Sequence, residues 1–153
     1  MSGDDADHAY GTAAPDAPAT RAELGLAEIA ERSSISAPSA ASLAPIHLIA
    51  GPDSDGFKPE ALSLLLSSEY RILPSSNRVG TRLEGPALPR SDAPEVSRPM
   101  VLGAIEVPRD GQPIVLGPEH PTTGGYPIIA VVASADLGRL FSIRLGGTVR
   151  FTR

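Results

Sequence analysis

The sequence lacks several residue types on which common protein activities depend. It contains no cysteine, which excludes disulfide frameworks, thiol nucleophiles and zinc sites built from cysteine. Lys58 is the one lysine and the arginines are scattered, so there is no basic stripe that would attract nucleic acid. No apolar run approaches the roughly 20 residues that span a bilayer. We therefore expect a protein that binds neither nucleic acid nor membrane.

Motifs for metals and nucleophiles are also missing. The histidines are His8, His47 and His120, which lie far apart and lack the spacing of metal ligands. The sequence has no G-x-S-x-G nucleophile elbow and no phosphate-binding loop that ends in lysine. The carboxylates are dispersed and form no obvious acid–base pair. We therefore expect no bound metal, assign no catalytic residue, and keep only His120, in a polar loop, as a candidate functional histidine.

Charge is distributed unevenly along the 153 residues. Residues 1–45 carry seven acidic and two basic side chains, whereas residues 46–153 carry eleven of each, so the net charge of −5 lies on the N-terminal segment. This segment is rich in Ala, Ser and Pro, which is typical of a disordered leader. It has neither the basic nor the apolar region of a secretory signal. We expect a soluble cytoplasmic protein with a disordered acidic leader, residues 1–45, and one domain, residues 46–153.

The domain consists of short apolar segments separated by turn signals. Residues 58–68 have helical spacing, with Pro59 and Glu60 favouring a first turn, and residues 134–141 allow one helical turn with Ser134 as its cap. Strand-like segments are residues 46–50, 69–74, 81–85, 101–108, 112–117, 127–134 and 148–152. Most gaps between them are too short or too rich in proline for the crossover helices of a doubly wound fold. The pattern predicts a mainly β barrel or sandwich with two short helices.

The segment SNRVGTRLEGP, residues 76–86, contains two arginines close to a turn. If its second half is extended, Arg78, Gly80, Arg82 and Glu84 share one face of a strand. Two guanidinium groups on that face could bind carboxylate or phosphate oxygens in pairs. The residues leave an alternative open, in which Arg82 pairs with Glu84 or another acidic residue for structural reasons and Arg78 is solvated.

The segment HPTTGGYPIIA, residues 120–130, combines hydroxyls, glycines and a phenol. Thr122 and Thr123 supply hydroxyl groups, the two glycines that begin at Gly124 allow close approach to backbone N–H groups, and Tyr126 precedes an apolar strand. Such groups could hold an oxyanion or an amide. A tight turn with a surface tyrosine is the alternative that the residues leave open.

Three segments together resemble a known family. They read SNRVGTRLEGP at residues 76–86, GAIEVPRDGQPIVL at residues 103–116 and TTGGYPIIAVVASADLGRL at residues 122–140. In this order and spacing they are similar to the carboxyltransferase-like family, which includes the C subunit of bacterial ATP-dependent 5-oxoprolinase, proteins described as allophanate hydrolase subunit 2, and the carboxyltransferase part of urea carboxylase. Residues 46–57 also resemble the family's strand-GP-x-x-x-x-F segment.

The sequence departs from the family pattern at three positions. Val79 and Thr81 stand where methionine and tyrosine are usual, and Glu106 stands where glutamine is common. The resemblance covers only the C-terminal half of the family domain, because residues 1–45 contain nothing similar to the G-x-x-[TS]-x-Q-D-x-G-R-x-G-type motif of the other half. It therefore implies one cyclophilin-like β-barrel lobe, where family members have two with a ligand site between them and against a partner subunit.

The resemblance also implies a site. Carried over position by position, it gives a substrate-binding set in which one polar cluster faces another: Asn77, Arg78 and Arg82 on one side, and Gln112, Thr123, Gly124 and Tyr126 on the other. Neither cluster contains a nucleophile. The family implies ATP, a partner that corresponds to the B subunit of 5-oxoprolinase, and an amide or urea-like small molecule. Biotin is not expected to be attached, because no Met-Lys-Met-type acceptor is present and Lys58 lies at a helix start.

The hypothesis that follows is a hydrolase subunit. The chain would belong to an ATP-dependent amide-processing enzyme, and the first candidate is 5-oxoprolinase, which opens 5-oxoproline to glutamate. Its role would be to bind and polarise the amide. The alternative hypotheses are a non-catalytic lobe that binds and regulates a partner, and an inactive truncated homologue. The sequence does not choose between 5-oxoproline and urea-derived substrates.

Overall fold

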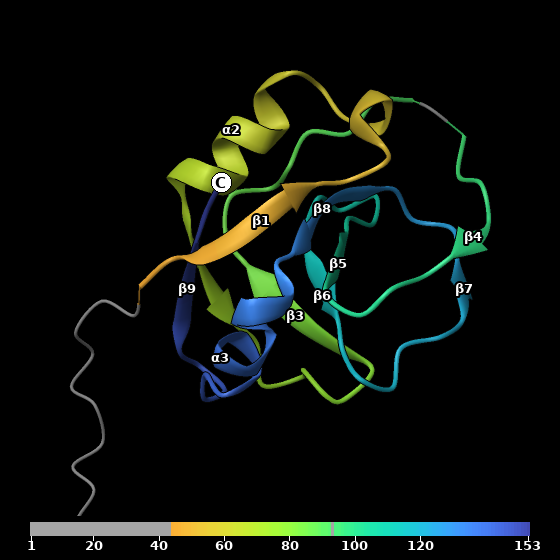
Figure 1. Cartoon of the computed structure of the whole chain (residues 1–153). Helices are drawn as coiled ribbons and strands as arrows, with labels where there is room; N and C mark the ends of the chain where they lie inside the picture. The colour runs from red at the N-terminus through yellow and green to blue at the C-terminus, as the bar shows by residue number, and fades with distance from the viewer. Residues whose placement is uncertain (1–43, 93) are drawn as a thin grey trace, which may run out of the picture. The chain divides into compact units, whose positions relative to one another are not determined.

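The computed structural model describes residues 44–92 and 94–153, which form a mainly β domain. Seven strands close a barrel in the order β1-β8-β5-β6-β3-β2-β9, and β4 and β7 form a two-stranded arm beside it (Figure 1). The barrel strands are β1 (Ile46–Ala50), β2 (Glu69–Ile72), β3 (Gly80–Glu84), β5 (Ala104–Glu106), β6 (Ile114–Leu116), β8 (Ile128–Val132) and β9 (Thr148–Thr152). The predicted mainly β fold is confirmed.

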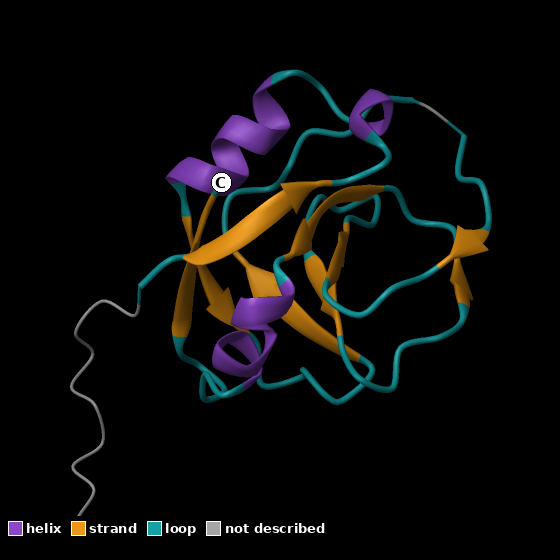
Figure 2. Ribbon diagram, viewed as in Figure 1, coloured by secondary structure: helices purple, strands orange, loops and turns teal. Residues whose placement is uncertain are grey.

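Short helical segments and the arm complete the domain (Figure 2). The helices are α2 (Glu60–Ser67) and α3 (Leu137–Phe141), the 3-10 turns are η1 (Ser54–Gly56) and η2 (Ser134–Asp136), and the arm strands are β4 (Arg98–Pro99) and β7 (Thr123–Gly124). The two predicted short helices are therefore present. No helix of the described residues is long and apolar enough to cross a membrane. The leader predicted at residues 1–45 lies outside the described residues, apart from its last two positions.

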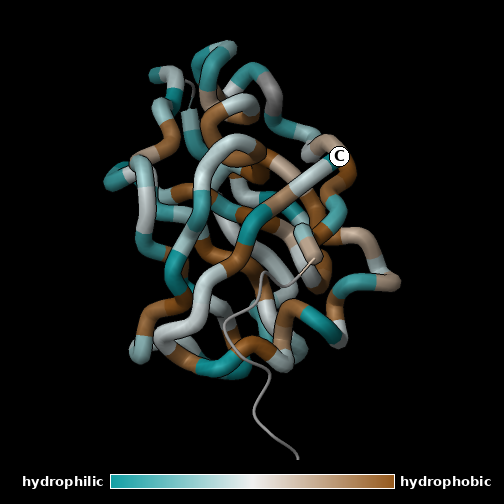
Figure 3. Tube along the Cα trace, turned by 90° about the vertical axis from the view of Figure 1, so that its left-hand side faces the viewer, coloured by the Kyte–Doolittle hydropathy of each residue, from teal (hydrophilic) through white to brown (hydrophobic). Residues whose placement is uncertain are grey.

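Alternation of side chains explains how these strands form a barrel. In β9, Val149 and Phe151 are buried, whereas Thr148 and Arg150 are exposed. In β2, Tyr70 and the last residue of the strand are buried in the same way. Because successive side chains of a strand point to opposite faces, each strand contributes one apolar face to the interior. Figure 3 shows the result as hydrophobic and hydrophilic stretches that alternate along the strands.

The most apolar strand, β8, lies between β1 and β5 in the barrel. It pairs antiparallel with β1 and with β5, and a bulge shifts the register between Ile105 and Glu106. The barrel closes where β1 pairs in parallel with β9, with Ile46 opposite Phe151. The pairing is antiparallel at every other contact between the described strands.

Two apolar clusters hold the domain together. The larger one fills the barrel, and it includes Leu65 from α2 and Leu140 from α3, both fully buried. The smaller one consists of Met100, Ala104, Leu116 and Ile128, with Val131 packed against it. It lies on the outside of the sheet, where the residue after β4 covers β5, β6 and β8. The arm is therefore fixed to the barrel by a small core of its own.

The structure corrects three details of the sequence prediction. The strand expected at residues 101–108 is confined to Ala104–Glu106, because a turn precedes it in which Gly103 has a φ of 80°. The 3-10 turn η2 has Ala133 at its N-cap position and no side-chain cap bond, so Ser134 does not cap it. The arm was not predicted, because a strand of two residues beside a proline shows no alternation.

Candidate functional site

The three sequence blocks that carry the family resemblance come together on four neighbouring strands. The first block contains β3, the second contains β5 and β6, and the third contains β8. These strands follow one another in the barrel as β8-β5-β6-β3. Strands that are up to 52 positions apart, from residue 80 to residue 132, therefore build one continuous side of the barrel (Figure 1).

A row of side chains crosses this side of the barrel. Arg82 of β3 lies opposite Ile114 of β6, and Ile114 in turn lies opposite Glu106 of β5. Glu106 lies opposite Ile128 of β8. Neighbouring strands are about 4.8 Å apart, so roughly 10 Å separates the backbones that carry Arg82 and Glu106. We call these four residues the Arg82 row.

The Arg82 row faces outward. The neighbours of Arg82 along β3, Thr81 and Leu83, are 8% and 0% exposed, whereas Arg82 itself is exposed. On β6 and β5, Val115 and Ile105 are fully buried in the barrel core. The predicted shared face of β3 is confirmed in part, because alternation places Arg82 on its outer side with the first and last residues of the strand.

Arg82 and Glu106 are electrostatically coupled without forming an ion pair. Burial raises the pKa of the Glu106 carboxyl, and the positive charge of Arg82 opposes that rise. No ion pair or hydrogen bond of either side chain is found among residues 44–92 and 94–153. Glu84 pairs instead with Arg71, at 3.9 Å between Nη1 and Oε2, so the structural Arg82–Glu84 pair considered from the sequence does not form. The row thus offers a cation and a partly buried carboxyl on either side of Ile114.

Gln112 does not face this row as an open binding group. Its Oε1 accepts a hydrogen bond from the Gly85 N–H at 3.1 Å, and its Nε2 donates to the Gly85 carbonyl at 3.2 Å. The amide thereby continues the pairing of β3 and β6 beyond the end of both strands. In this structure the amide of Gln112 joins the first and second blocks.

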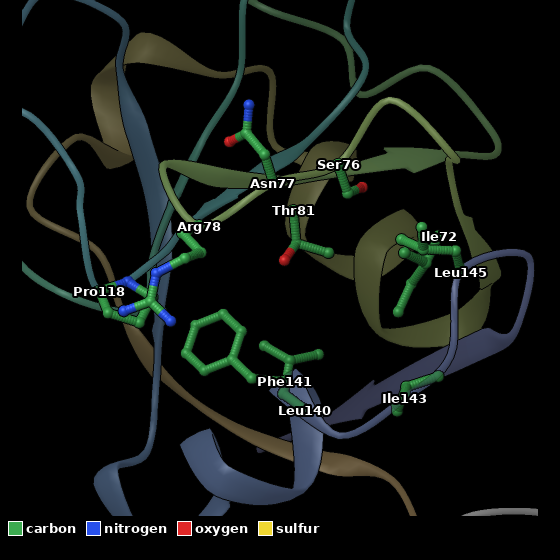
Figure 4. A pocket seen from close by; sticks show the side chains of 10 residues that line it. All are labelled: Ile72, Ser76, Asn77, Arg78, Thr81, Pro118, Leu140, Phe141, Ile143 and Leu145. Atoms are coloured by element: carbon green, nitrogen blue, oxygen red, sulfur yellow. The ribbon is translucent and has the colours of Figure 1, made fainter.

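Asn77 and Arg78 lie away from the Arg82 row, at the turn before β3. The Asn77 Oδ1 accepts hydrogen bonds from the backbone N–H of Val79, at 2.9 Å, and of Gly80, at 3.2 Å. The Arg78 Nε donates to Glu119 Oε1 at 2.5 Å, and both side chains are largely exposed. Both residues line a cavity of about 290 Å³ at one end of the barrel (Figure 4). The two arginines of the first block therefore lie on different parts of the domain, Arg82 in the Arg82 row and Arg78 at the cavity.

The remaining predicted residues belong to the arm and to the bend that follows it. Thr123 is exposed in β7, and Gly124 packs so closely on Met100 that a Cβ would lie 2.4 Å from its Cε. Tyr126 is 39% exposed and lies two residues before Ile128. The backbone thus brings Tyr126 towards the Ile128 end of the Arg82 row, while Thr123 and Gly124 form the arm. His120 lies with its Nδ1 2.8 Å from the Pro121 carbonyl oxygen.

The sequence singled out Arg82 as a candidate binding residue and did not single out Glu106. The sequence feature that could have pointed to Glu106 is that a glutamate stands where the family pattern commonly has glutamine. That substitution could be interpreted only with the pairing of β5, β6 and β3, because this pairing brings Glu106 to the same row as Arg82. The sequence did not show that neighbourhood.

The described residues do not provide a site for a metal or for a triphosphate. No group of three or more His, Asp or Glu side chains in the described ranges could hold a metal ion. Lys58 precedes α2 and follows no glycine-rich loop, and Arg98, the arginine of the arm, is bound to Asp53. The described residues thus contain no phosphate-binding loop that ends in lysine, and we derive no step through ATP on this part of the chain.

The closed barrel and the three blocks on one outer side define a carboxyltransferase-type lobe. The chain belongs to the family described as carboxyltransferase domain, subdomain A and B, whose model matches residues 9–153. The match begins at residue 9, so it includes part of the segment that the charge pattern assigns to a leader. The resemblance stated from the three blocks is confirmed.

Named relatives support the same family. The chain is 35% identical over 132 residues to the 5-oxoprolinase C subunit of Haemophilus influenzae, covering 86% of this chain and 39% of that protein. It is 34% identical over 109 residues to the 5-oxoprolinase C subunit of Escherichia coli, covering 71% and 35%. The crystal structure of urea amidolyase from Kluyveromyces lactis superposes with a TM-score of 0.65 at 28% identity, covering 70% of this chain and 7% of that one. The chain spans less than two fifths of the length of each of these two 5-oxoprolinase C subunits.

Proposed function

We propose that this chain is part of an ATP-dependent amide-processing hydrolase, with 5-oxoproline as the substrate, and that the Arg82 row binds the amide. The observation that carries the proposal is the placement of Arg82 and Glu106 on either side of Ile114. An amide presents a carbonyl acceptor and an N–H donor. Arg82 would donate to the carbonyl oxygen, and Glu106 would accept from the N–H group.

The chemistry assigned to these residues is binding and polarisation. A guanidinium that binds the carbonyl oxygen stabilises negative charge as it develops there, which favours attack on the carbonyl carbon. The half-buried position of Glu106 strengthens its hydrogen bonds, because the local dielectric is lower than in water. The apolar side chain of Ile114, between Arg82 and Glu106, would pack against the bound group. We assign no nucleophilic role to either polar residue of the row.

The names of two relatives and the residues of this chain complete the proposal. Two of the curated relatives are named as the C subunit of 5-oxoprolinase, so we propose a partner that corresponds to the B subunit of such an enzyme. We also propose that ATP is bound by other subunits, because the described residues do not form a triphosphate site, and that no biotin is attached to this chain. The outer side of the barrel, with Tyr126 at its edge, is the surface proposed for the shared site.

The proposal predicts that Arg82→Ala lowers turnover at least about tenfold, the loss expected for one charge-assisted hydrogen bond. The full chain is combined with a B-type partner, with and without a separately expressed N-terminal lobe of a family member. ATP hydrolysis that depends on 5-oxoproline is then measured together with glutamate formation. Glu106→Gln keeps an acceptor oxygen and is expected to retain more activity than Glu106→Leu.

Arg150→Ala is the matched control. Arg150 is an exposed arginine on β9 that binds Glu69, with 3.0 Å between Nε and Oε2, and it lies outside the Arg82 row. Its removal is expected to leave turnover unchanged. Equal turnover of Arg82→Ala and the unmodified chain would make Arg82 a structural residue. A stable complex without turnover would favour a non-catalytic regulatory lobe.

A further inference from the structure

The cavity at the end of the barrel is separate from the Arg82 row. Thr81 lines the cavity, and the next residue, Arg82, points to the outer side of the same strand. Consecutive residues of a strand face opposite ways, so β3 itself separates the two places. The cavity measures about 290 Å³, which is close to the lower end of the range of ligand sites, roughly 300–1,000 Å³.

Most of the cavity wall is apolar and comes from two distant parts of the chain. Ile72 from the end of β2 forms one side (Figure 4). Leu140 and Phe141 from α3, with Ile143 from the loop after it, form the other, whereas Leu145 lies beside Ile72. Leu145 is 59% exposed and stands at the mouth. These side chains would cover the hydrocarbon part of a small molecule.

One polar group points into this space without a partner. Thr81 is only 8% exposed, and it is the one polar residue that is buried among the residues whose burial is described. Its hydroxyl makes no hydrogen bond to any described residue. The neighbouring polar groups are engaged: Ser76 Oγ accepts from the Arg82 N–H at 2.9 Å, and Asn77 Oδ1 binds the backbone of its own turn. The hydroxyl is accessible from the cavity, so it is free to bind a molecule that enters the cavity.

Arg78 supplies the charge at the cavity, and its ion pair with Glu119 offsets that charge in part. Of the described residues that line it, Arg78 alone is charged, and none carries a carboxylate. Glu119 binds the Nε of Arg78, which leaves the two terminal nitrogens for another acceptor. Figure 4 shows the guanidinium beside Pro118 and the ring of Phe141. Carboxylates and phosphates are the groups that such a paired donor binds; the small, largely apolar cavity favours a carboxylate.

We propose that this cavity binds a small carboxylic acid with a short apolar chain. The carboxylate lies between Arg78 and the Thr81 hydroxyl, and the chain packs on Phe141 and Leu145. The ligand class follows from the three properties of the cavity: an apolar wall, one unpartnered hydroxyl and one cation. The site is independent of the amide site proposed on the outer side of the barrel.

Titration with hexanoate, followed by amide chemical shifts of the full chain, tests the proposal. We expect saturable shifts at residues that line the cavity, and weaker binding of 1-hexanol, which has the same chain but no charge. Thr81→Val removes the hydroxyl at nearly constant shape and is expected to weaken hexanoate binding about tenfold. Arg78→Gln is expected to remove the preference for hexanoate over 1-hexanol.

Stability measurements separate a binding effect from a folding defect. Since the Thr81 hydroxyl has no partner, Thr81→Val is expected to leave the free energy of unfolding of the ligand-free chain unchanged or higher, while binding weakens. Arg150→Gln, on the far strand β9, is the control for a general change in charge. Absence of saturable shifts, equal affinity for 1-hexanol, or unchanged binding by Thr81→Val would overturn the proposal.

Discussion

The Tyr70 side chain is fully buried in the barrel, and its phenol group has one partner. The hydroxyl donates to the Pro86 carbonyl at 3.0 Å, and the ring lies 6.2 Å from that of Phe151, at an interplanar angle of 51°. A Cβ at Gly85 would lie 2.6 Å from the Tyr70 ring. Gly85, the second glycine of the first sequence block, is therefore required by this packing, which has no direct connection with ligand binding.

The burial of Tyr70 predicts an alkaline limit to stability. Burial raises the pKa of its hydroxyl from 10.0 to about 12. Because the pKa is higher in the folded state, this contribution to stability is complete below pH 10 and is lost as the pH rises from 10 through 12. The difference corresponds to about 3 kcal/mol. Urea unfolding between pH 8 and 12 measures it.

Tyr70→Phe is the variant that isolates this effect. It is expected to lower stability at neutral pH by about 1 kcal/mol, because the Pro86 carbonyl loses its donor, and to remove the Tyr70 part of the alkaline decline. A decline of the same steepness in the variant would show that another group causes it.

The candidate site residues show which positions of a site a sequence can place. Arg82 could be found, because alternation along one strand places it outward whatever the neighbouring strand contains. Asn77 and Gln112 were assigned to substrate, yet their amides bind backbone groups of the turn before β3 and of Gly85. Glu106 was missed because its relation to Arg82 depends on strand order. Side-chain type alone does not distinguish an amide that binds ligand from one that binds backbone.

At the scale of elements, one carboxylate joins the arm to the barrel. Asp53, in the loop after β1, forms an ion pair with Arg98 of β4 through Oδ1. Its Oδ2 accepts a hydrogen bond from the Ile128 N–H at 2.8 Å. The Asp53 side chain is 10% exposed. Three segments that have no neighbouring positions in the sequence therefore meet at this residue.

Asp53→Ala is expected to lower the free energy of unfolding by about 2 kcal/mol, since it leaves the Ile128 N–H and Arg98 without an acceptor. Amide hydrogen exchange at Ile128 and in β7 should accelerate more than exchange in β9. Asp92→Ala, at an exposed carboxylate without an ion pair among the described residues, serves as the control. Equal exchange rates in both variants would contradict the role of Asp53 as a clamp.

The elements themselves could be predicted where a regular pattern exists. The segments 46–50 and 148–152 match their strands, and residues 58–68 contain α2, because apolar spacing and turn residues agree there. The arm could not be predicted, since Arg98–Pro99 and Thr123–Gly124 are too short to show a period. The cavity could not be predicted either, because its walls come from β2, the turn before β3, and α3.

At the scale of the whole domain, a charged network fixes the beginning of the barrel. The Asp136 Oδ2 accepts from the backbone N–H of His47 at 2.7 Å, and the same oxygen lies 2.8 Å from the His47 Nδ1. Arg139 Nη2 contacts this oxygen at 2.9 Å and donates to the Pro45 carbonyl at 2.8 Å. The network ties β1 to the turn after β8, next to the place where the barrel closes.

This network predicts a loss of stability in acid. The hydrogen bonds from the backbone and ring of His47, followed by the charge of Arg139, hold the pKa of Asp136 below its ordinary value of 3.8. A lowered pKa in the folded state contributes stability that is present above pH 3.8 and is lost as the pH falls below it. Asp136→Asn keeps an acceptor but removes the charge.

The difference in stability between the unmodified chain and Asp136→Asn should therefore shrink as the pH falls from 5 to 2. Thermal unfolding at a series of pH values measures that difference. A gap between the two chains that stays constant through this range would show that the charge of Asp136 is not what stabilises the junction.

The parallel contact between β1 and β9 also constrains the order of events during synthesis. Ile46 meets Phe151, so the ring of strands cannot close until almost the whole sequence shown has been translated. Until then β1 and β2 each have an edge without its final neighbour, and such edges are prone to pair with other chains. Contacts of this sequence separation also slow folding. We expect nascent chains of this protein to depend on protection of these edges until the last strand is available.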